Sequence, residues 1–254
     1  MPRFSPFRGL RYDPQLAPLS QVIAPPYDVI EPAERLRLAA RSSFNAVHLE
    51  LPEPDLRAGL DRYQVATQLL AAWRRDGVLL PEETPAYYLY AMEAGGHRTL
   101  GVVGALGLPE ADEEGEVLPH EETLPKPRSD RLDLLRATGA NLSPIWGLSL
   151  ADGLSRVLVP SADPEIDVYD DGGVRHQLWV VGSSAGGPIG EAVAAAPVVI
   201  ADGHHRYETA RTYQREVRAE RGAAPGGHDW GPWSVLWAEF LDRSEFRAHC
   251  AAPQ

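Results

Sequence analysis

The chain has 254 residues, 44% of them hydrophobic, which is enough apolar material for one large α/β domain or two small ones. Its formal net charge is −12 and no long Lys/Arg run occurs, which argues against nucleic-acid binding because such proteins need a basic surface. No apolar stretch reaches the roughly 18 residues of a bilayer span. We also expect no signal peptide, since the N-terminus lacks an apolar core. Cys250 is the only cysteine, so an intrachain disulfide is excluded and a cytoplasmic protein is expected.

The first part of the sequence, residues 1–108, is expected to be an N-terminal α/β part. Residues 24–30 contain two consecutive prolines and predict a stiff loop. Pro32 suits the first turn of a helix that runs to about Arg41. Residues 45–51 alternate between apolar and polar side chains and predict a strand. Between residues 59 and 76 the apolar side chains recur at helical spacing, which predicts an amphipathic helix.

Two hairpins and several further elements are expected after this helix. Residues 86–92 and 99–108 flank a Gly-Gly turn, and residues 165–170 and 174–181 flank Asp-Gly-Gly, so each pair predicts a hairpin. We further expect a helix at 131–140, a strand at 144–150, a flexible loop at 182–190, a strand near 198–200 and a helix from about 205 to 220. Hairpins mixed with helices predict an α+β (mixed α/β) fold, with a mixed sheet and flanking helices.

Residues 198–210 are the stretch with the clearest chemistry. A β-branched run predicts a buried strand that turns at Asp202-Gly203 into a helix. The start of a helix presents free backbone N–H groups, which bind phosphate well. His204, His205 and Arg206 add hydrogen-bond donors, whereas the Asp202 carboxylate repels phosphate unless a cation such as Mg²⁺ lies between them. The alternative interpretation is a capped helix that carries two surface histidines.

A second polar stretch covers residues 118–127, where prolines bound a loop that contains His120 and Glu121. A carboxylate on such a loop is well positioned, which suits a general base. Lys126 is a possible partner for a phosphate, and Arg131 is either a phosphate ligand or a charge on a helix surface. The alternative for the whole stretch is a solvated acidic loop.

These stretches carry a resemblance to a known family. The sequence resembles the uncharacterised bacterial and archaeal family called "domain of unknown function 1015". The resemblance rests on residues 6–12, 22–30, 44–45, 49–52, 119–127, 131–144 and 200–210. It makes it plausible that Tyr27 and Asp28 border a pocket, while Asn141 and Ser143 are turn residues suited to closing a loop near it.

A more distant resemblance suggests an activity. Pro119-His120-Glu121 together with residues 202–206 is similar to motifs of the free serine kinases in the ParB/sulfiredoxin-like superfamily. That resemblance implies a ParB/sulfiredoxin-like nucleotide-binding core in residues 109–221. It also implies Glu121 as the base, with His120 beside it, and residues 202–206 as the site for nucleotide phosphates and metal.

The resulting hypothesis is a nucleotide-dependent kinase, using ATP or ADP with Mg²⁺, that phosphorylates a small hydroxyl metabolite such as free serine. A non-catalytic nucleotide-binding protein of ParB-like type is one alternative. A metal-dependent hydrolase that uses His120, Glu121, His204 and His205 is another. Residues 222–254 do not resemble the continuation of either family, which suggests a truncated or frameshifted chain. We expect a small-molecule substrate and a nucleotide as partners, and neither nucleic acid nor membrane.

Overall fold

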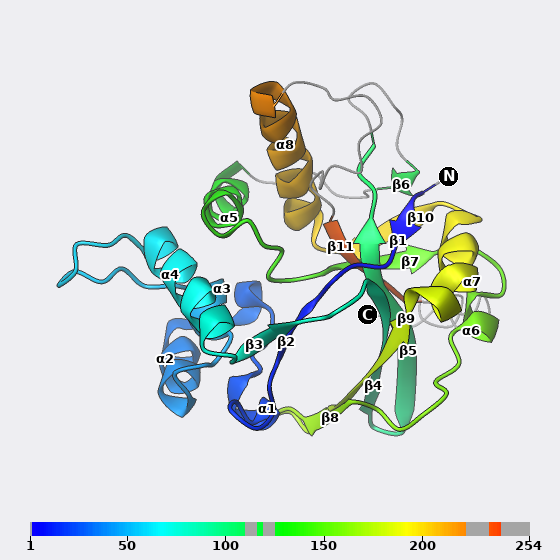
Figure 1. Ribbon diagram of the computed structural model, residues 1–254, viewed down its shortest axis with the longest axis horizontal. Helices are drawn as coiled ribbons and strands as arrows, with labels where there is room; N and C mark the ends of the chain where they lie inside the picture. Colours follow the sequence, from blue (N-terminus) through cyan, green and yellow to red (C-terminus); the bar gives the residue numbers. More distant parts are fainter. Residues whose placement is uncertain (1, 110–115, 119–124, 222–233, 240–254) are drawn as a thin grey trace, which may run out of the picture.

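A computed structural model describes residues 2–109, 116–118, 125–221 and 234–239. It has a mixed α+β fold, in which helices from the first 80 residues lie to one side of a large sheet (Figure 1). The elements of this first part are β1 (Phe4–Ser5), β2 (Leu10–Tyr12), α1 (Leu19–Val22), the 3-10 helix η1 (Tyr27–Val29), α2 (Pro32–Arg41), α3 (Val47–Glu50), α4 (Arg62–Arg75) and β3 (Leu79–Pro81).

The rest of the described chain supplies most of the sheet and the helices that pack on it. Its elements are β4 (Ala86–Ala94), β5 (His97–Leu106), β6 (Val117–Leu118), α5 (Pro125–Thr138), β7 (Ile145–Ser149), α6 (Leu154–Val157), β8 (Ile166–Tyr169), β9 (Arg175–Gly182), α7 (Ser183–Ala194), β10 (Val198–Asp202), α8 (His204–Arg221) and β11 (Ser234–Glu239). None of the described helices combines the length and the apolar character that a bilayer span requires.

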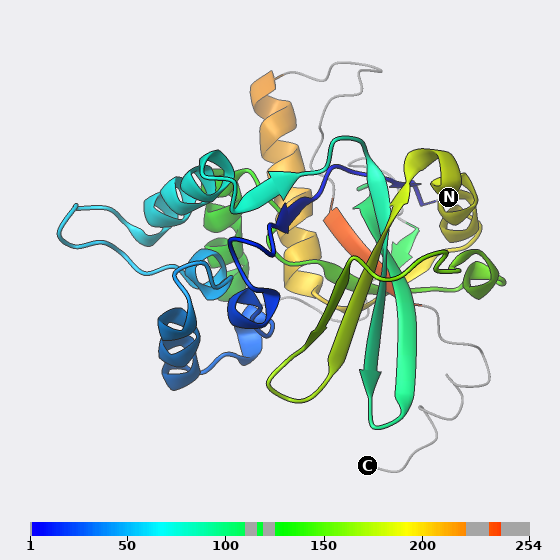
Figure 2. The same ribbon diagram turned by 60° about the horizontal axis from the view of Figure 1, so that its bottom comes forward.

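The large sheet is mixed. Its strands follow the order β6-β10-β7-β11-β5-β4-β9-β8, and β1 pairs with the end of β5. The pairs β6–β10 and β7–β11 are parallel, whereas the others are antiparallel. Strands β4, β5 and β9 form the long antiparallel part that is clearest in Figure 2. Part of the tail beyond residue 221 thus enters the centre of the sheet as β11.

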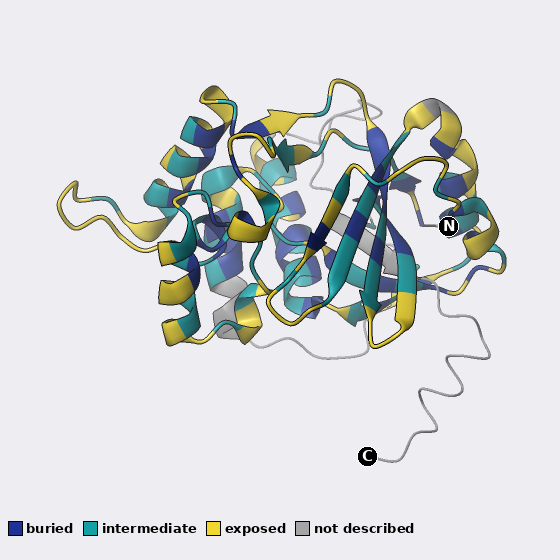
Figure 3. Cartoon of the chain, turned by 90° about the horizontal axis from the view of Figure 1, so that it is seen from below, coloured by how far each residue is buried: buried dark blue, intermediate teal, exposed yellow. Residues whose placement is uncertain are grey.

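Two clusters of buried side chains hold the fold together, and their dark segments lie on the inner faces of the elements in Figure 3. One cluster fills the space between the large sheet and helices α6, α7 and α8. The other lies among the helices of the first part, around Val22, Leu70 and Trp73. Helix α5 packs against both α4 and α8, so it joins the first part to the β10–α8 region.

Most elements expected from the sequence are confirmed. The helix at 32–41, the amphipathic helix before Gly77 and both hairpins are present. Gly77 ends α4 with a φ of 75°, a conformation that only glycine adopts readily. The helix at 131–140 is found as the later part of α5, and the strand at 144–150 is β7.

The strand predicted at residues 45–51 is wrong, because the chain there forms the short helix α3. Asn45 accounts for the difference. Its side-chain oxygen accepts a hydrogen bond of 3.0 Å from the N–H of Val47, which starts a turn. Its amide nitrogen donates to the carbonyl oxygens of Gln21, at 2.9 Å, and Ile23, at 3.1 Å. These long-range contacts override the alternating pattern.

The flexible loop predicted at residues 182–190 is also wrong, because helix α7 occupies it. Gly186 and Gly190 lie one turn apart and face the ring of Tyr87 on β4. A Cβ atom at Gly186 would lie 2.4 Å from the ring, and one at Gly190 would lie 2.7 Å from the hydroxyl. The small residues therefore allow close packing of α7 on the sheet, and that packing overrides their low helix propensity.

Replacement of Asn45 by alanine should destabilise the fold. The side chain is fully buried, so its loss leaves two carbonyl groups and one N–H group without their partners. We expect the free energy of unfolding to fall by about 2–4 kcal/mol, as measured by urea denaturation. Asp55→Ala is the matched control, since Asp55 makes the same kind of turn on an exposed loop and should cost about 1 kcal/mol or less. Equal losses at the two positions would contradict this explanation of α3.

Candidate functional site

The junction between β10 and α8 has the shape predicted for an anion site. Strand β10 ends at Asp202, and α8 begins at His204. Gly203 links them with a φ of 92°, so the chain reverses sharply within one residue. The N–H of Tyr207 donates to the Gly203 carbonyl at 3.0 Å and closes the first turn. The positive end of the dipole of this 18-residue helix therefore lies at the junction, where it favours an anion.

The Arg206 side chain is fixed across this junction. Its guanidinium donates to the Asp202 carboxylate at 2.5 Å and also to the carbonyl oxygen of Pro144. Gly203 allows this arrangement, because a Cβ atom there would lie 3.1 Å from the Arg206 Nε and 3.4 Å from the Cα of Ile145. Arg206 is consequently held in one orientation, and a preorganised guanidinium binds phosphate with little loss of entropy.

A second guanidinium comes from α5. Arg131 is buried, and its Cζ lies 4.1 Å from the centre of the Tyr27 ring, which the Arg206 Cζ approaches to 6.0 Å. Arg131 also donates to Asp130 at 2.6 and 3.0 Å. The Tyr27 ring is thus close to both cations, an arrangement that helps to order them. Burial raises the pKa of Tyr27 although both cations oppose this, so its hydroxyl stays neutral.

Glu50 completes the cluster from α3. Its side chain is about 10% exposed, and its Oε2 lies 3.3 Å from the Arg131 Nη1. Its Oε1 accepts a hydrogen bond of 2.6 Å from the hydroxyl of Ser143. Burial raises the pKa of Glu50, although the Ser143 hydrogen bond and the charges of Arg131 and Arg206 oppose this. Arg131 and Ser143, which are both distant from α3 in the sequence, therefore meet at one buried carboxylate.

A small cavity of about 50 Å³ opens beside this carboxylate. It has room for a group of a few heavy atoms, such as a phosphate or the end of a small metabolite. Its polar lining comes from α3, α5, α8 and the loop before β7, and consists of Glu50, Arg131, Asn141, Ser143, Arg206 and Thr209. Both cations and the buried carboxylate thus face the same small space.

The structure brings together many of the residues predicted from the sequence. Tyr27, Arg131, Ser143, Asp202 and Arg206 are linked by the contacts given above, and Asn141 lines the cavity. Asp28 lies beside Tyr27 in η1, where its charge acts on both Tyr27 and Glu50.

The remaining residues predicted from the sequence are either histidines at the start of α8 or residues whose side chains are not described. His204 is buried and His205 is half-buried, so the alternative of two surface histidines is not what the structure has. Lys126 lies in the first turn of α5, and its side chain is not among those described. His120 and Glu121 lie outside the described residues. Among the residues that the structure describes, no three His, Cys, Asp or Glu side chains gather closely enough to hold a metal ion.

Two residues of the cavity were missed by the sequence analysis. Glu50 lies within residues 45–51, whose alternation predicted a strand and not a site. Thr209 lies three residues after Arg206, which places both on one face of α8. That helical spacing was a usable signal for Thr209, whereas nothing local marked Glu50.

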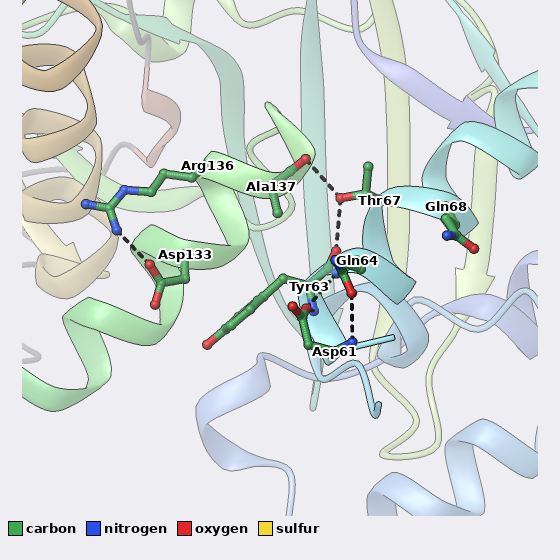
Figure 4. Close-up of a pocket in the computed structure, with 8 residues that line it drawn as sticks. All are labelled: Asp61, Tyr63, Gln64, Thr67, Gln68, Asp133, Arg136 and Ala137. Atoms are coloured by element: carbon green, nitrogen blue, oxygen red, sulfur yellow. Dashed lines mark hydrogen bonds and ion pairs between the residues drawn. The ribbon is translucent and has the colours of Figure 1, made fainter. Parts of the chain in front are cut away.

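A larger groove lies on the other side of α5. Figure 4 shows it between α4 and α5, with Asp61, Tyr63 and Thr67 on one wall and Asp133 and Arg136 on the other. Its volume is about 660 Å³. Thr67 already donates to the Ala137 carbonyl across it at 2.9 Å, and Arg136 pairs with Asp133 at 2.6 Å. These groups satisfy one another, so the groove is less suited to a charged ligand than the Glu50 cavity.

Replacement of Gly203 by alanine should strain the junction. The positive φ and the contacts with Arg206 and Ile145 both disfavour a side chain, so we expect stability to fall by about 1–3 kcal/mol in urea denaturation. Gly182→Ala is the control, because Gly182 precedes α7 with a φ of −58° and has nothing within 4 Å of its Cβ position. It should change stability by about 0.5 kcal/mol or less. A neutral effect of Gly203→Ala would mean that the junction is not sterically constrained.

Comparison with known proteins identifies the family and no more. No curated protein and no solved structure matches the chain. One family model matches residues 4–242, a range that includes every described element of the site and also β11. Because this match covers far more than half of the sequence, the chain belongs to the family described as "Protein of unknown function (DUF1015)".

Proposed function

We propose that this protein is a nucleotide-dependent kinase that phosphorylates a small hydroxyl metabolite, with free serine as the first candidate acceptor. The observation that carries the proposal is the convergence of Arg131 and Arg206 beside the N-terminus of α8. Phosphoryl transfer depends mainly on positioning and on neutralising the charge of the phosphates. The Arg206 guanidinium and the helix N-terminus supply both, while Arg131 orients the neighbouring Glu50 carboxylate.

The phosphates of the nucleotide would lie at the β10–α8 junction. Backbone N–H groups of the first turn of α8 and the Arg206 guanidinium would donate to their oxygens. Gly203 suits this role because the missing side chain leaves room for the Arg206 guanidinium to lie across the turn. The ParB/sulfiredoxin-like core inferred from the motifs belongs to the same proposal.

Magnesium fits the balance of charge at the site. The carboxylates nearby outnumber the two guanidinium groups, since they come from Asp28, Glu50, Asp130 and Asp202. A phosphate chain entering such a site needs an accompanying cation. Mg²⁺ is commonly bound by one or two carboxylates together with substrate phosphates, and Asp202 is half-exposed at the phosphate end. When bound there, the ion would neutralise charge that develops on the phosphates.

The acceptor would enter the cavity beside Glu50. Its size suits the hydroxyl-bearing end of a small molecule and not a macromolecule. Asn141, Ser143 and Thr209 offer polar side chains at its wall for recognition. The role of Glu121 as base stays a prediction from the sequence, because that residue lies outside the described part of the chain.

Nucleotide binding is the first test. With Mg²⁺ and nucleotide at about 100 times the dissociation constant, the folded state should gain about 2.7 kcal/mol. In a domain of this size that corresponds to a rise of about 5–10 °C in melting temperature. Arg206→Ala should weaken binding by about 10- to 100-fold, since it removes a charge-assisted contact of about 1.5–3 kcal/mol. Formation of phosphoserine from serine and the best-binding nucleotide then tests transfer.

Arg215→Ala is the matched control, because Arg215 is an exposed arginine two turns further along the same helix. It should leave the melting shift within error of the unsubstituted protein. If ATP, ADP, CTP and GTP with Mg²⁺ all leave the melting temperature unchanged, the proposal fails. Binding without any phosphorylated product would instead favour the ParB-like alternative.

A further inference from the structure

We infer that Glu50 is a catalytic carboxylate of this site, which takes the proton from the hydroxyl of the acceptor during phosphoryl transfer. This inference rests on the proposed function and adds to it a residue that neither the motifs nor the family match assigns. Its basis is the position of one buried carboxylate beside the cavity and against a hydroxyl group.

A buried glutamate such as Glu50 is not expected if its only role is to stabilise the fold. A buried ion pair seldom stabilises a fold more than an apolar pair of similar size, because both charges lose their hydration. Glu50 lies on a four-residue helix whose other buried side chains are the aliphatic Val47 and Leu49. An aliphatic side chain at position 50 would continue that pattern. The charge is therefore better explained by chemistry at the cavity.

The geometry already shows how Glu50 would receive a hydroxyl group. The Ser143 hydroxyl donates to Oε1 at 2.6 Å, within the reach that proton transfer requires. Oε2 is turned toward Arg131, at 3.3 Å, which fixes the orientation of the carboxylate. An acceptor hydroxyl in the adjoining cavity would meet the same carboxylate. Arg206 lines that cavity too, so the phosphate end and the acceptor end share one wall.

The charged groups that act on Glu50 come from three elements. Arg131 and Arg206 face it from α5 and α8, and Asp28 faces it from η1. Tyr12 on β2 is close enough for the charge of Glu50 to act on it. Burial and that charge together raise the pKa of Tyr12 far above its usual value. Burial raises the pKa of Glu50 as well, which brings the carboxylate closer to the strength of a useful base at neutral pH.

The acceptor oxygen forms a bond to the terminal phosphorus of the nucleotide, and the bond from that phosphorus to the bridging oxygen breaks. The acceptor proton moves to Glu50, and the nucleotide leaves with one phosphate fewer. Arg206 holds the charge that develops on the phosphates. Glu50 later returns its proton to solvent.

The test is Glu50→Gln in the full chain, assayed for phosphoserine formation with Mg²⁺ and the nucleotide that binds best. Gln keeps the size of the side chain and an oxygen that accepts from Ser143, but it cannot take a proton. We expect kcat to fall by at least about 100-fold, the usual contribution of a general base. The melting shift caused by the nucleotide should stay as in the unsubstituted protein. Glu53→Gln, three residues away on the surface, should change kcat less than twofold.

The pH profile separates catalysis from a structural role and does not depend on one variant folding. If Glu50 must be ionised, kcat should fall toward acid pH in the unsubstituted protein and in Glu50→Asp. Ser143→Ala removes a hydrogen bond that lowers the pKa of Glu50, so the pKa should rise in this variant. The fall of kcat on the acid side of the pH profile should therefore begin at a higher pH. The motif-based assignment of the base to Glu121 is the competing outcome, since a larger loss of activity in Glu121→Gln than in Glu50→Gln would contradict the inference.

Two further results would overturn the inference while leaving the kinase proposal intact. One is activity of Glu50→Gln within threefold of the unsubstituted protein. The other is a fall of kcat on the acid side that Ser143→Ala does not move. Absence of any phosphorylated product from the unsubstituted protein, with every nucleotide tried, would remove the kinase proposal and this inference together.

Discussion

The contact between Arg131 and Glu50 is the interaction on which the candidate site depends. It joins α3 of the first part to α5, and α5 packs in turn on α8. Removal of Arg131 would leave the buried Glu50 carboxylate without its ion-pair partner, and such a loss typically costs about 3–5 kcal/mol. Asp130, Tyr27 and Ser143 are arranged around this pair and fix both of its groups. The helices of the first part are thereby tied to the strand-to-helix junction that carries Arg206.

Because Arg131 is buried with Glu50, Arg131 and Arg206 have different roles. Arg131 is held by two carboxylates and the face of Tyr27, so much of its hydrogen-bonding capacity is used within the protein. Arg206 is braced by Asp202 and the Pro144 carbonyl at the mouth of the junction. It is therefore the better placed of the two to meet an incoming phosphate, while Arg131 orients Glu50. The site thus contains one arginine that is placed to bind the ligand, Arg206, and one that orients a catalytic carboxylate, Arg131.

The sequence correctly predicted the elements whose conformation depends on neighbouring residues. Hairpins set by Gly-Gly and Asp-Gly-Gly turns, and the helix closed by Gly77, follow from neighbouring residues. The errors at α3 and α7 arise where distant contacts decide, through Asn45 in one case and Tyr87 in the other. The same division holds for the site. The junction at Asp202-Gly203 was visible as a motif in the sequence. Glu50 becomes a candidate site residue only through its contacts with Arg131 and Ser143, which depend on the tertiary fold.

The β10–α8 junction is proposed to hold the phosphates of a nucleotide. A crystal structure of the full chain with Mg²⁺ and a non-hydrolysable ATP analogue would show whether it does. We expect electron density for the terminal phosphates against the first turn of α8 and the guanidinium of Arg206, with the Glu50 cavity open beside them. An analogue seated in the groove between α4 and α5, or none at the junction at saturating concentration, would contradict it.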